Sequence, residues 1–317
     1  MIVTVTPAPS IDWTLAVADF SFGAVNRASG STREPSGKGV NVAFALHRAG
    51  VATTTVFPAG GSTGEFMVDA LVNRGVPTVV IPTQRDVRTN VSLVTAQHPG
   101  TKINESGTAL DPETVAALLE AVADLAERAD TVVSCGSLPA GVPETFHRDV
   151  ASLAAAHGCD AVVDTSGAPL AAALAAQPAL IKPNHEELAE LAGQRIDTLG
   201  DAIGAARSAC DRGAQAVLAS LGAQGVLYCG PEAVIHAYAV GTPVVNSVGA
   251  GDALLAGFIG GGPDLEDRVR TAVLWATSAV AYPTTLFPIR PEFAHAITLT
   301  AEPDRAMPLT EPHLVHP

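Results

Sequence analysis

NSVGAGD, at residues 246–252, runs directly into the small and apolar residues ALLAGFI at 253–259. The apolar run predicts a buried helix, and Gly249 and Gly251 permit a tight turn at its start. Such a turn leaves backbone N–H groups unpaired at a helix N-terminus, where a phosphate or a developing negative charge binds well. Asp252 places a carboxylate beside that anion site. A base next to a phosphate-binding turn is what phosphorylation of a hydroxyl requires.

Asp252 also has a simpler explanation, because acidic residues stabilise helix N-termini through the helix dipole. For an isolated Gly-Asp pair before a helix, this structural role is the more common one. The motifs elsewhere in the chain favour the catalytic interpretation.

Composition limits the classes of function. The chain has 317 residues, of which 47% are hydrophobic, so it can form one large α/β domain with an elaboration, or two domains. It contains no apolar run of transmembrane length and no signal-like start, so we expect a cytoplasmic protein without a membrane partner. The net charge of −14 argues against nucleic acid as a partner. The four cysteines, Cys135, Cys159, Cys210 and Cys229, form no CxxC pair, and we expect reduced thiols and neither a metal site nor a disulfide framework.

Lysine is rare in this chain. Of 18 basic residues, only Lys38, Lys102 and Lys182 are lysines. Lys38 lies between two glycines, in a turn that is not a P-loop because GxxxxGK[ST] is absent. Together with Asn41 on the following helical turn, it suits a phosphate and a sugar hydroxyl, although a solvated turn lysine would explain it equally well.

Strands and helices are expected to alternate through most of the chain. Runs of β-branched and apolar residues predict strands at 1–6, 53–57, 131–135 and 216–220, and a strand with its exit loop at 161–166, with helices between them. This alternation predicts a doubly wound, mainly parallel sheet with helices on both faces. LGAQG at 221–225 predicts a hairpin that leads into 226–228. In such a sheet, ligands bind at the carboxyl ends of the strands, where the polar residues of this chain gather.

Two segments break the alternation. Residues 13–35 and 86–106 alternate apolar and polar positions without a helical period, which predicts short strands. We expect both segments to join in one small sheet that covers a cleft. The predicted α/β core therefore comprises residues 1–12, 41–84 and 109–317, and the predicted lid comprises 13–40 and 85–108.

Taken together, the motifs resemble those of the PfkB, or ribokinase-like, carbohydrate kinases. SGKGVNVA (36–43), SCGSLPAGVP (134–143), KPNHEEL (182–188) and NSVGAGDALLAGF (246–258) follow the order of that family, and the resemblance covers residues 1–290. Within the family the chain is most similar to the branch of 1-phosphofructokinases and tagatose-6-phosphate kinases. The resemblance implies ATP, Mg²⁺ and a phosphorylated ketose, fructose 1-phosphate first, with tagatose 6-phosphate and fructose 6-phosphate as alternatives. It also implies that the lids of two subunits pair in a homodimer, since a small exposed sheet has edges that need covering.

The resemblance implies a role for each matching residue. Asp252 would be the base, and the backbone of Gly249, Ala250 and Gly251 would form the anion hole. Asn184 and, through water, Glu187 would organise Mg²⁺. The nucleotide side would comprise Lys182, Asn184, Ser220, Gly222 and Gly225. The sugar-phosphate side would comprise Asp12, Gly37, Lys38, Asn41, Arg88 and Ser137.

Departures from the family pattern fall on the sugar side and leave the identity of the sugar open. The first motif of the family reads TLNPAID, and Ala8 stands here in place of its Asn. Ser92 stands where this branch often carries Lys. These losses fit a catalytically weak sugar-phosphate sensor, whereas the intact Asp252 favours an enzyme. A nicotinamide-dependent Rossmann enzyme is disfavoured, because position 254 of this glycine motif is not glycine.

Overall fold

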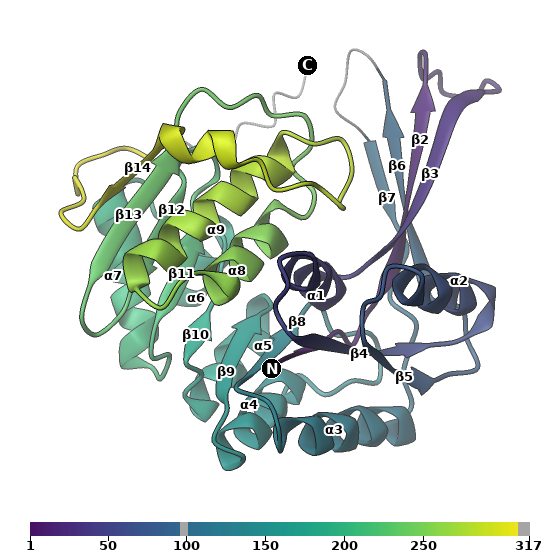
Figure 1. Cartoon of the computed structure of the whole chain (residues 1–317), viewed down its shortest axis with the longest axis horizontal. Coiled ribbons are helices and arrows are strands. Elements are labelled where there is room, and N and C mark those ends of the chain that lie inside the picture. Colours follow the sequence, from purple (N-terminus) through teal and green to yellow (C-terminus); the bar gives the residue numbers. More distant parts are fainter. Residues whose placement is uncertain (96–100, 310–317) are drawn as a thin grey trace.

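Two β-sheets organise the molecule in the computed structural model, which describes residues 1–95 and 101–309 (Figure 1). Residues 96–100 of the predicted lid and 310–317 of the predicted core lie outside the described part. The larger sheet has ten strands in the order β14-β13-β12-β11-β10-β9-β8-β1-β4-β5, and the smaller has four in the order β3-β2-β6-β7.

The larger sheet is parallel from β5 to β11. Its strands are β1 (Ile2–Val5), β4 (Thr53–Ala59), β5 (Thr78–Pro82), β8 (Thr131–Cys135), β9 (Asp160–Asp164), β10 (Leu180–Ile181) and β11 (Val217–Ser220). Three antiparallel strands follow at one edge: β12 (Val226–Cys229), β13 (Val234–Ala239) and β14 (Ile297–Thr300). The predicted hairpin into 226–228 is present, with a short 3₁₀ helix at Gly222–Gln224 in its loop. The sequence analysis did not predict β13 and β14.

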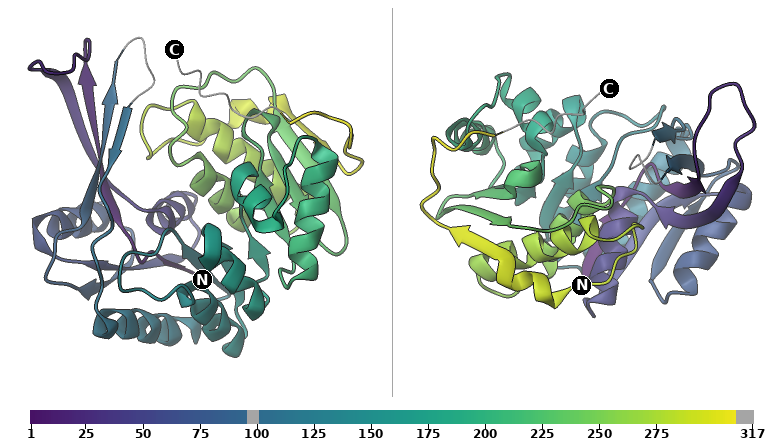
Figure 2. Two further views of the ribbon diagram at one scale, coloured as in Figure 1. Left: turned by 180° about the vertical axis from the view of Figure 1, so that it is seen from behind. Right: turned by 90° about the horizontal axis from the view of Figure 1, so that it is seen from above.

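Helices cover both faces of this sheet, which confirms the doubly wound architecture (Figure 2). They are α1 (Lys38–Arg48), α2 (Gly61–Val72), α3 (Pro112–Ala126), α4 (Phe146–Ala156), α5 (Gly167–Ala173), α6 (His185–Ala192), α7 (Leu199–Asp211), α8 (Ala250–Gly260) and α9 (Leu265–Val280). Successive strand residues enter opposite cores, as the two-residue repeat of a strand requires. Val163 packs in the cluster that contains residues of α3 to α7, whereas Val162 packs in the cluster that contains residues of α1, α8 and α9.

The smaller sheet combines the two predicted insertions and stands beside α1 and α2 (Figure 1). Its strands are β2 (Ser10–Val17), β3 (Ala28–Ser36), β6 (Arg88–Val94) and β7 (Thr101–Asn104). The sheet is mixed, because two antiparallel pairs are joined by the parallel pair β2–β6. We call it the lid sheet. Its boundaries differ slightly from those predicted, since β2 already begins at Ser10 and α1 already begins at Lys38.

Candidate active site

Asp252 lies in the first turn of α8 and is 7% exposed. Gly249 caps this helix in a left-handed conformation, with φ at 76°. A Cβ at this position would lie 2.9 Å from Cγ2 of Thr285, so only glycine fits without strain. The turn therefore places the carboxylate of Asp252 in the first turn of α8, beside N–H groups that have no partner within the helix itself.

The Asp252 carboxylate is held from the neighbouring helix. The Asn41 amide, on α1, donates a hydrogen bond to Oδ2 of Asp252 at 2.8 Å. The pKa of Asp252 is raised to about 6, first because burial disfavours its charge and second because Asp164 is a nearby anion. Lys38, Asn41 and Lys182 act in the opposite direction. The carboxylate is therefore ionised at neutral pH but is a stronger base than an ordinary aspartate.

Asp164 links Lys38 to Lys182, although the sequence analysis did not select it. It ends β9 with no exposed surface, and Lys38 Nζ donates to its Oδ1 at 2.7 Å while Lys182 Nζ lies 3.2 Å from its Oδ2. Burial by itself would raise the pKa of Asp164, but the two ammonium groups outweigh burial and lower it. The only signal in the sequence was a polar residue at the carboxyl end of a predicted strand.

Lys38, expected on the sugar-phosphate side, already has an anionic partner within the protein. Its side chain is 36% exposed and is bound to Asp164. Lys182, expected on the nucleotide side, is 3% exposed and shares the same carboxylate. A Cβ built on Gly251 would lie 3.5 Å from Nζ of Lys182, so this ammonium also lies beside the turn at the start of α8. The structure thus brings two cations and two carboxylates into one cluster.

A chain of hydrogen bonds connects this cluster to the lid sheet. Besides Asp252, the Asn41 amide contacts Oγ of Ser36 at 3.4 Å, and Ser36 donates to Oδ2 of Asp12 at 2.8 Å. Asn90 of β6 donates to Oδ1 of Asp12 at 3.0 Å. The face of the lid sheet that carries Asp12 and Asn90 is therefore the one that meets the cluster of Asp252, Asp164, Lys38 and Lys182.

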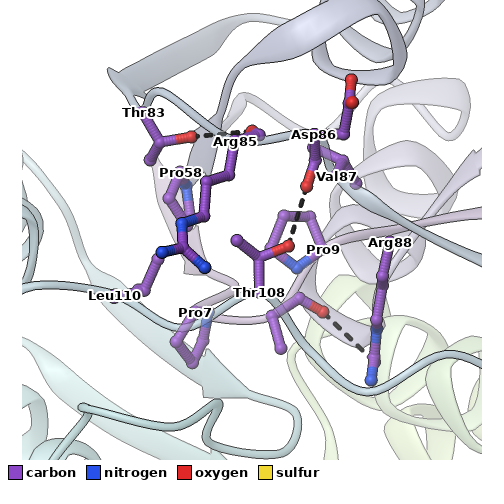
Figure 3. A pocket seen from close by; sticks show the side chains of 11 residues that line it. Pro7, Pro9, Pro58, Thr83, Arg85, Asp86, Val87, Arg88, Thr108 and Leu110 are labelled. Atoms are coloured by element: carbon purple, nitrogen blue, oxygen red, sulfur yellow. Dashed lines mark hydrogen bonds between the residues drawn. The ribbon is translucent and has the colours of Figure 1, made fainter.

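Arg88 lies at the base of the lid sheet, in the pocket shown in Figure 3. Its Nη2 donates to the backbone oxygen of Ala8 at 3.4 Å (Figure 3). Burial lowers the pKa of Arg88, and the nearby Asp12 carboxylate opposes this shift. Ala8, which replaces the family's Asn, is 5% exposed, so its methyl group adds no polar contact. Gly37 caps α1 at a φ of 117°, where a Cβ would lie 2.9 Å from Thr6. Ser137 is exposed in the loop after β8.

Three buried polar atoms near this face have no hydrogen-bond partner within the described residues: Asn41 Oδ1, Asn90 Oδ1 and Arg88 Nε. Buried polar groups are nearly always paired, with protein, water or a ligand. These atoms therefore suit a bound molecule rich in hydroxyl groups or phosphate oxygens.

The lid sheet also supplies a cation that the sequence analysis did not assign. Lys102 of β7 stands directly opposite Ser92 of β6 in the antiparallel register, just as Asn104 stands opposite Asn90. Side chains of directly opposed residues share one face, and so do residues two apart on a strand. Lys102 therefore belongs to the Asp12–Asn90 face, at the position where Ser92 lacks the expected charge.

The predicted metal and nucleotide residues lie at the neighbouring strand ends. Asn184 caps α6 and forms a reciprocal capping box with Glu187: Asn184 Oδ1 accepts from the Glu187 N–H at 2.8 Å, and Glu187 Oε2 accepts from the Asn184 N–H at 2.9 Å. Asn184 also forms an isolated parallel bridge with Ser220, at the end of β11. The start of α6 and the end of β11 are thus adjacent. The capping box uses only one of the two carboxylate oxygens of Glu187.

The loop after Ser220 depends on two glycines. Gly222 and Gly225 have φ values of 59° and 85°, and a Cβ on Gly225 would lie 2.1 Å from the backbone oxygen of Ala237. His236 Nε2 lies 2.7 Å from the backbone oxygen of Gln224 and fastens the loop to β13. The loop is therefore fixed in place beside Asn184.

Comparison with known proteins agrees with this geometry. Residues 2–291 match the model of the pfkB family of carbohydrate kinases. A 1-phosphofructokinase from Bacillus subtilis is 37% identical over 82% of this chain and 85% of its own. This chain belongs to the pfkB family of carbohydrate kinases. A D-tagatose-1-phosphate kinase from Bacillus licheniformis is 31% identical over 82% of this chain and 85% of its own. The crystal structure of phosphofructokinase-2 from Escherichia coli in complex with potassium has a TM-score of 0.85 at 31% identity, over 90% of this chain and 94% of its own.

A buried histidine that the sequence analysis did not identify supports the turn that follows β8. His147 of α4 is fully buried, with Nδ1 2.7 Å from Oγ of Ser134 and Nε2 3.1 Å from the backbone oxygen of Gly136. Thr165 donates to the same oxygen at 2.9 Å. Burial lowers the pKa of His147 to about 4, so the imidazole is neutral and holds the turn before Ser137 in place.

Two absences apply to the described part of this pfkB kinase. No group of three or more His, Cys, Asp or Glu side chains there is arranged to hold a metal ion. Across residues 1–95 and 101–309, no helix has the length and apolar character needed to cross a bilayer.

Proposed function

We propose that this kinase transfers a phosphoryl group from ATP to a hydroxyl of a phosphorylated ketose, with fructose 1-phosphate as the first candidate. The observation that supports this most strongly is the position of Asp252. Its carboxylate lies at the start of α8, beside the Lys38–Asp164–Lys182 cluster, with a pKa raised to about 6. A general base works best when its pKa lies near the working pH.

Each of the residues around Asp252 has its own role in phosphoryl transfer. Asp252 takes the proton of the attacking hydroxyl, and Asn41 keeps the carboxylate in position. The backbone N–H groups of Gly249, Ala250 and Gly251 face the transferred group, whose negative charge they stabilise. Lys182, buried beside Gly251, adds positive charge on the same side. Catalysis of this kind consists mainly of positioning and charge stabilisation.

Mg²⁺ fits the oxygen donors of this proposal. Mg²⁺ binds few protein ligands and keeps several waters. Glu187 and Asn184 would hold it through water, because the capping box leaves one Glu187 oxygen and the second lone pair of Asn184 Oδ1 outside its two hydrogen bonds. When bound, Mg²⁺ supplies charge neutralisation for the phosphates of ATP. Ser220, Gly222 and Gly225 would contact the nucleotide on this side.

The preference for a phosphorylated sugar rests on cations of the lid sheet. Arg88 and Lys102 lie on strands β6 and β7, on the face that also carries Asp12. Neither of these cations is part of the Asp164 cluster, which already occupies Lys38. A phosphate group on the substrate would contact both lid cations, while Asp12 and Asn90 would contact hydroxyl groups. The relatives named for phosphorylated ketoses support the same class.

The test is a substrate panel followed by coupled measurement of ADP release. The panel contains fructose 1-phosphate, fructose 6-phosphate, tagatose 1-phosphate, tagatose 6-phosphate, free fructose, ribose and a nucleoside. We expect kcat/KM for one phosphorylated ketose to exceed that for free fructose at least about 100-fold, since two hydrogen bonds to charged groups contribute roughly 3 kcal/mol. Equal turnover of free sugars would refute the role given to the lid cations, and absent turnover of every compound would favour a sensor.

Lys102 can be tested separately within this proposal. Lys102→Gln should raise KM for the sugar phosphate about tenfold, which corresponds to about 1.4 kcal/mol, and leave KM for ATP unchanged. Because Ser92 stands opposite Lys102, adding Ser92→Lys to that variant should restore most of the affinity. If the added lysine rescues nothing, the charge on this face does not contact the substrate.

We further propose that the lid sheet pairs with the lid of a second copy. The face opposite Asp12 carries Trp13, Val91 and Ile103, and Ile103 is 57% exposed. Phe22 and Val25, near the hairpin tip between β2 and β3, are 93% and 80% exposed. Exposed apolar groups of this kind often mark protein interfaces. Light scattering of the wild type and of an Ile103→Asp variant tests this, and a monomeric wild type would contradict it.

A further inference from the structure

A pair of cysteines lies outside the catalytic cluster, where α7 packs on β12. Cys210 is in the last turn of α7 and is half-buried, whereas Cys229 ends β12 and is 2% exposed. Sγ of Cys210 lies 3.9 Å from the backbone oxygen of Cys229. These two thiols are 19 residues apart in the sequence, so only the fold brings them together.

Both cysteines pack in the same hydrophobic core, and the Cys210 thiol faces the backbone of Cys229. The Cys210 side chain is the main cause that lowers the pKa of Cys229 to about 7. The guanidinium of Arg207, one helical turn before Cys210, lowers it further, while burial acts against both. The proximity of Cys229, together with burial, raises the pKa of Cys210. Cys229 is therefore the thiol of the pair that ionises more readily, and it lies beside a second thiol that solvent can reach.

The other two cysteines have neither feature. Cys135 is fully buried, and burial raises the pKa of its thiol well above the usual range. Cys159 is buried and donates to the backbone oxygens of Ala126 and Ala129 at 3.2 and 3.1 Å. Cys135 and Cys159 therefore serve as internal controls for the reactivity of Cys210 and Cys229.

We propose that Cys210 and Cys229 form a reversible oxidation site, at which a hydroperoxide converts the two thiols into an intrachain disulfide. This refines the expectation that all four cysteines remain reduced thiols. They are reduced in the structure, but this pair is placed to react. The proposal does not depend on the identity of the sugar substrate.

The reaction balances with the hydroperoxide as the oxidant. The thiolate sulfur attacks one oxygen of hydrogen peroxide, the O–O bond breaks, and one water leaves after protonation, which yields a sulfenic acid. The neighbouring thiol then attacks the sulfenic sulfur, an S–S bond forms, and a second water leaves. The two thiols lose two electrons, and the peroxide gains them.

Bridge formation should leave catalysis intact. Cys229 is paired with Val217, at the beginning of β11, whereas Ser220, on the ligand side, is paired with Val226 at the other end of the hairpin. The bridge would therefore lie near the edge of the sheet opposite the active site. The disulfide would close the segment between Cys210 and Cys229 into a loop. Such a loop restricts the unfolded chain and thereby stabilises the folded state.

The experiment treats the purified full-length protein with hydrogen peroxide and follows intact mass, free thiols and peptide maps. We expect a mass decrease of about 2 Da, from two lost hydrogen atoms, with a bridged 210–229 peptide pair and free Cys135 and Cys159. Dithiothreitol should restore the original mass. We also expect ADP release to stay unchanged and Tm to rise by a few degrees.

Three variants separate this site from general oxidation. Cys210→Ser should leave Cys229 as a sulfenic acid that dimedone traps. Arg207→Gln should slow thiol loss several-fold, because less of Cys229 is then ionised, while Arg207→Lys should react nearly as fast as the wild type. Oxygen addition without a bridge, a bridge to Cys135 or Cys159, or equal rates in Arg207→Gln and the wild type would overturn the proposal.

Discussion

Replacing Asp252 by Asn should make the protein more stable while it removes activity. The pKa of Asp252 is raised from 3.8 to about 6 in the folded protein, chiefly by burial and by the charge of Asp164. Between these two pH values the folded state binds more protons than the unfolded state, so stability falls as pH rises from about 4 to about 6. Above that range the ionised carboxylate destabilises the fold by a constant amount. Asparagine is isosteric, stays neutral and can still accept the hydrogen bond from Asn41 through its side-chain oxygen.

The magnitude follows from the size of the shift. A difference of about two pKa units corresponds to roughly 3 kcal/mol at pH 8, because each unit is worth about 1.4 kcal/mol. For a chain of 317 residues this is a rise in Tm of about 4 °C, from an unfolding entropy of roughly 2 cal/mol/K per residue. Near pH 4 the two proteins should be equally stable, since Asp252 is then protonated in the folded wild type.

The assay is thermal unfolding of the wild type and of Asp252→Asn across pH 4 to 8, with ADP release measured on the same samples. Turnover should fall by about 10² to 10⁴, the usual contribution of a general base. Asp124→Asn, at an exposed position on α3, is the matched control and should change neither property. A variant that is less stable than the wild type at pH 8, or that turns over normally, would refute the reasoning about this carboxylate.

Three further predictions concern the surroundings of that carboxylate. Asp164→Asn leaves Lys182 buried without a counter-charge and should destabilise the fold by about 3–5 kcal/mol in urea unfolding, whereas adding Lys182→Met should recover part of the loss. Wherever Asp164→Asn remains folded, the acidic limb of its kcat/KM profile should move to lower pH, since Asp164 raises the pKa of Asp252; an unmoved limb would contradict this coupling. His147→Phe should lose about 2 kcal/mol near pH 7.5 with its two hydrogen bonds. In the wild type the neutral imidazole stabilises the fold above pH 6.5, and this stability is lost as pH falls toward about 4, so the variant should have a flatter stability profile over that range. Gly249→Ala should reduce turnover more than it weakens sugar-phosphate binding, because its strained φ of 76° and the contact with Thr285 displace the N–H groups at the start of α8; equal effects in kinetics and in calorimetric binding would argue against it.

Local signals in the sequence indicated the class of the fold, although they did not indicate the antiparallel strands β13 and β14. Strand and helix periods are properties of neighbouring residues, so they indicated the parallel sheet and the two insertions before any contact was known. The glycine turn before Asp252 could also be predicted from the sequence, since a helix N-terminus and its capping glycine lie within one short segment. The family resemblance implied a role in Mg²⁺ binding for Asn184 and Glu187, and the structure adds that these two residues form a capping box.

The partners of charged residues could not be predicted from the sequence in the same way. Lys38 and Asp164 are 126 residues apart, and nothing near either residue indicates that they meet. The pKa of Asp252 likewise depends on burial and on Asp164, which are properties of the packed molecule. Lys102 faces Ser92 only because β6 and β7 adopt one particular register.

By itself, then, the sequence determined the alternation of strands and helices in the parallel part of the larger sheet, the doubly wound class and the family motifs, because these depend on short-range periodicity and on residues that act within one turn. Only the tertiary structure decided which charges share a site, how basic Asp252 is, and that Cys210 lies against Cys229. Coulomb energy and desolvation depend on distance and burial in three dimensions, and residues far apart in the chain acquire both only when the chain folds.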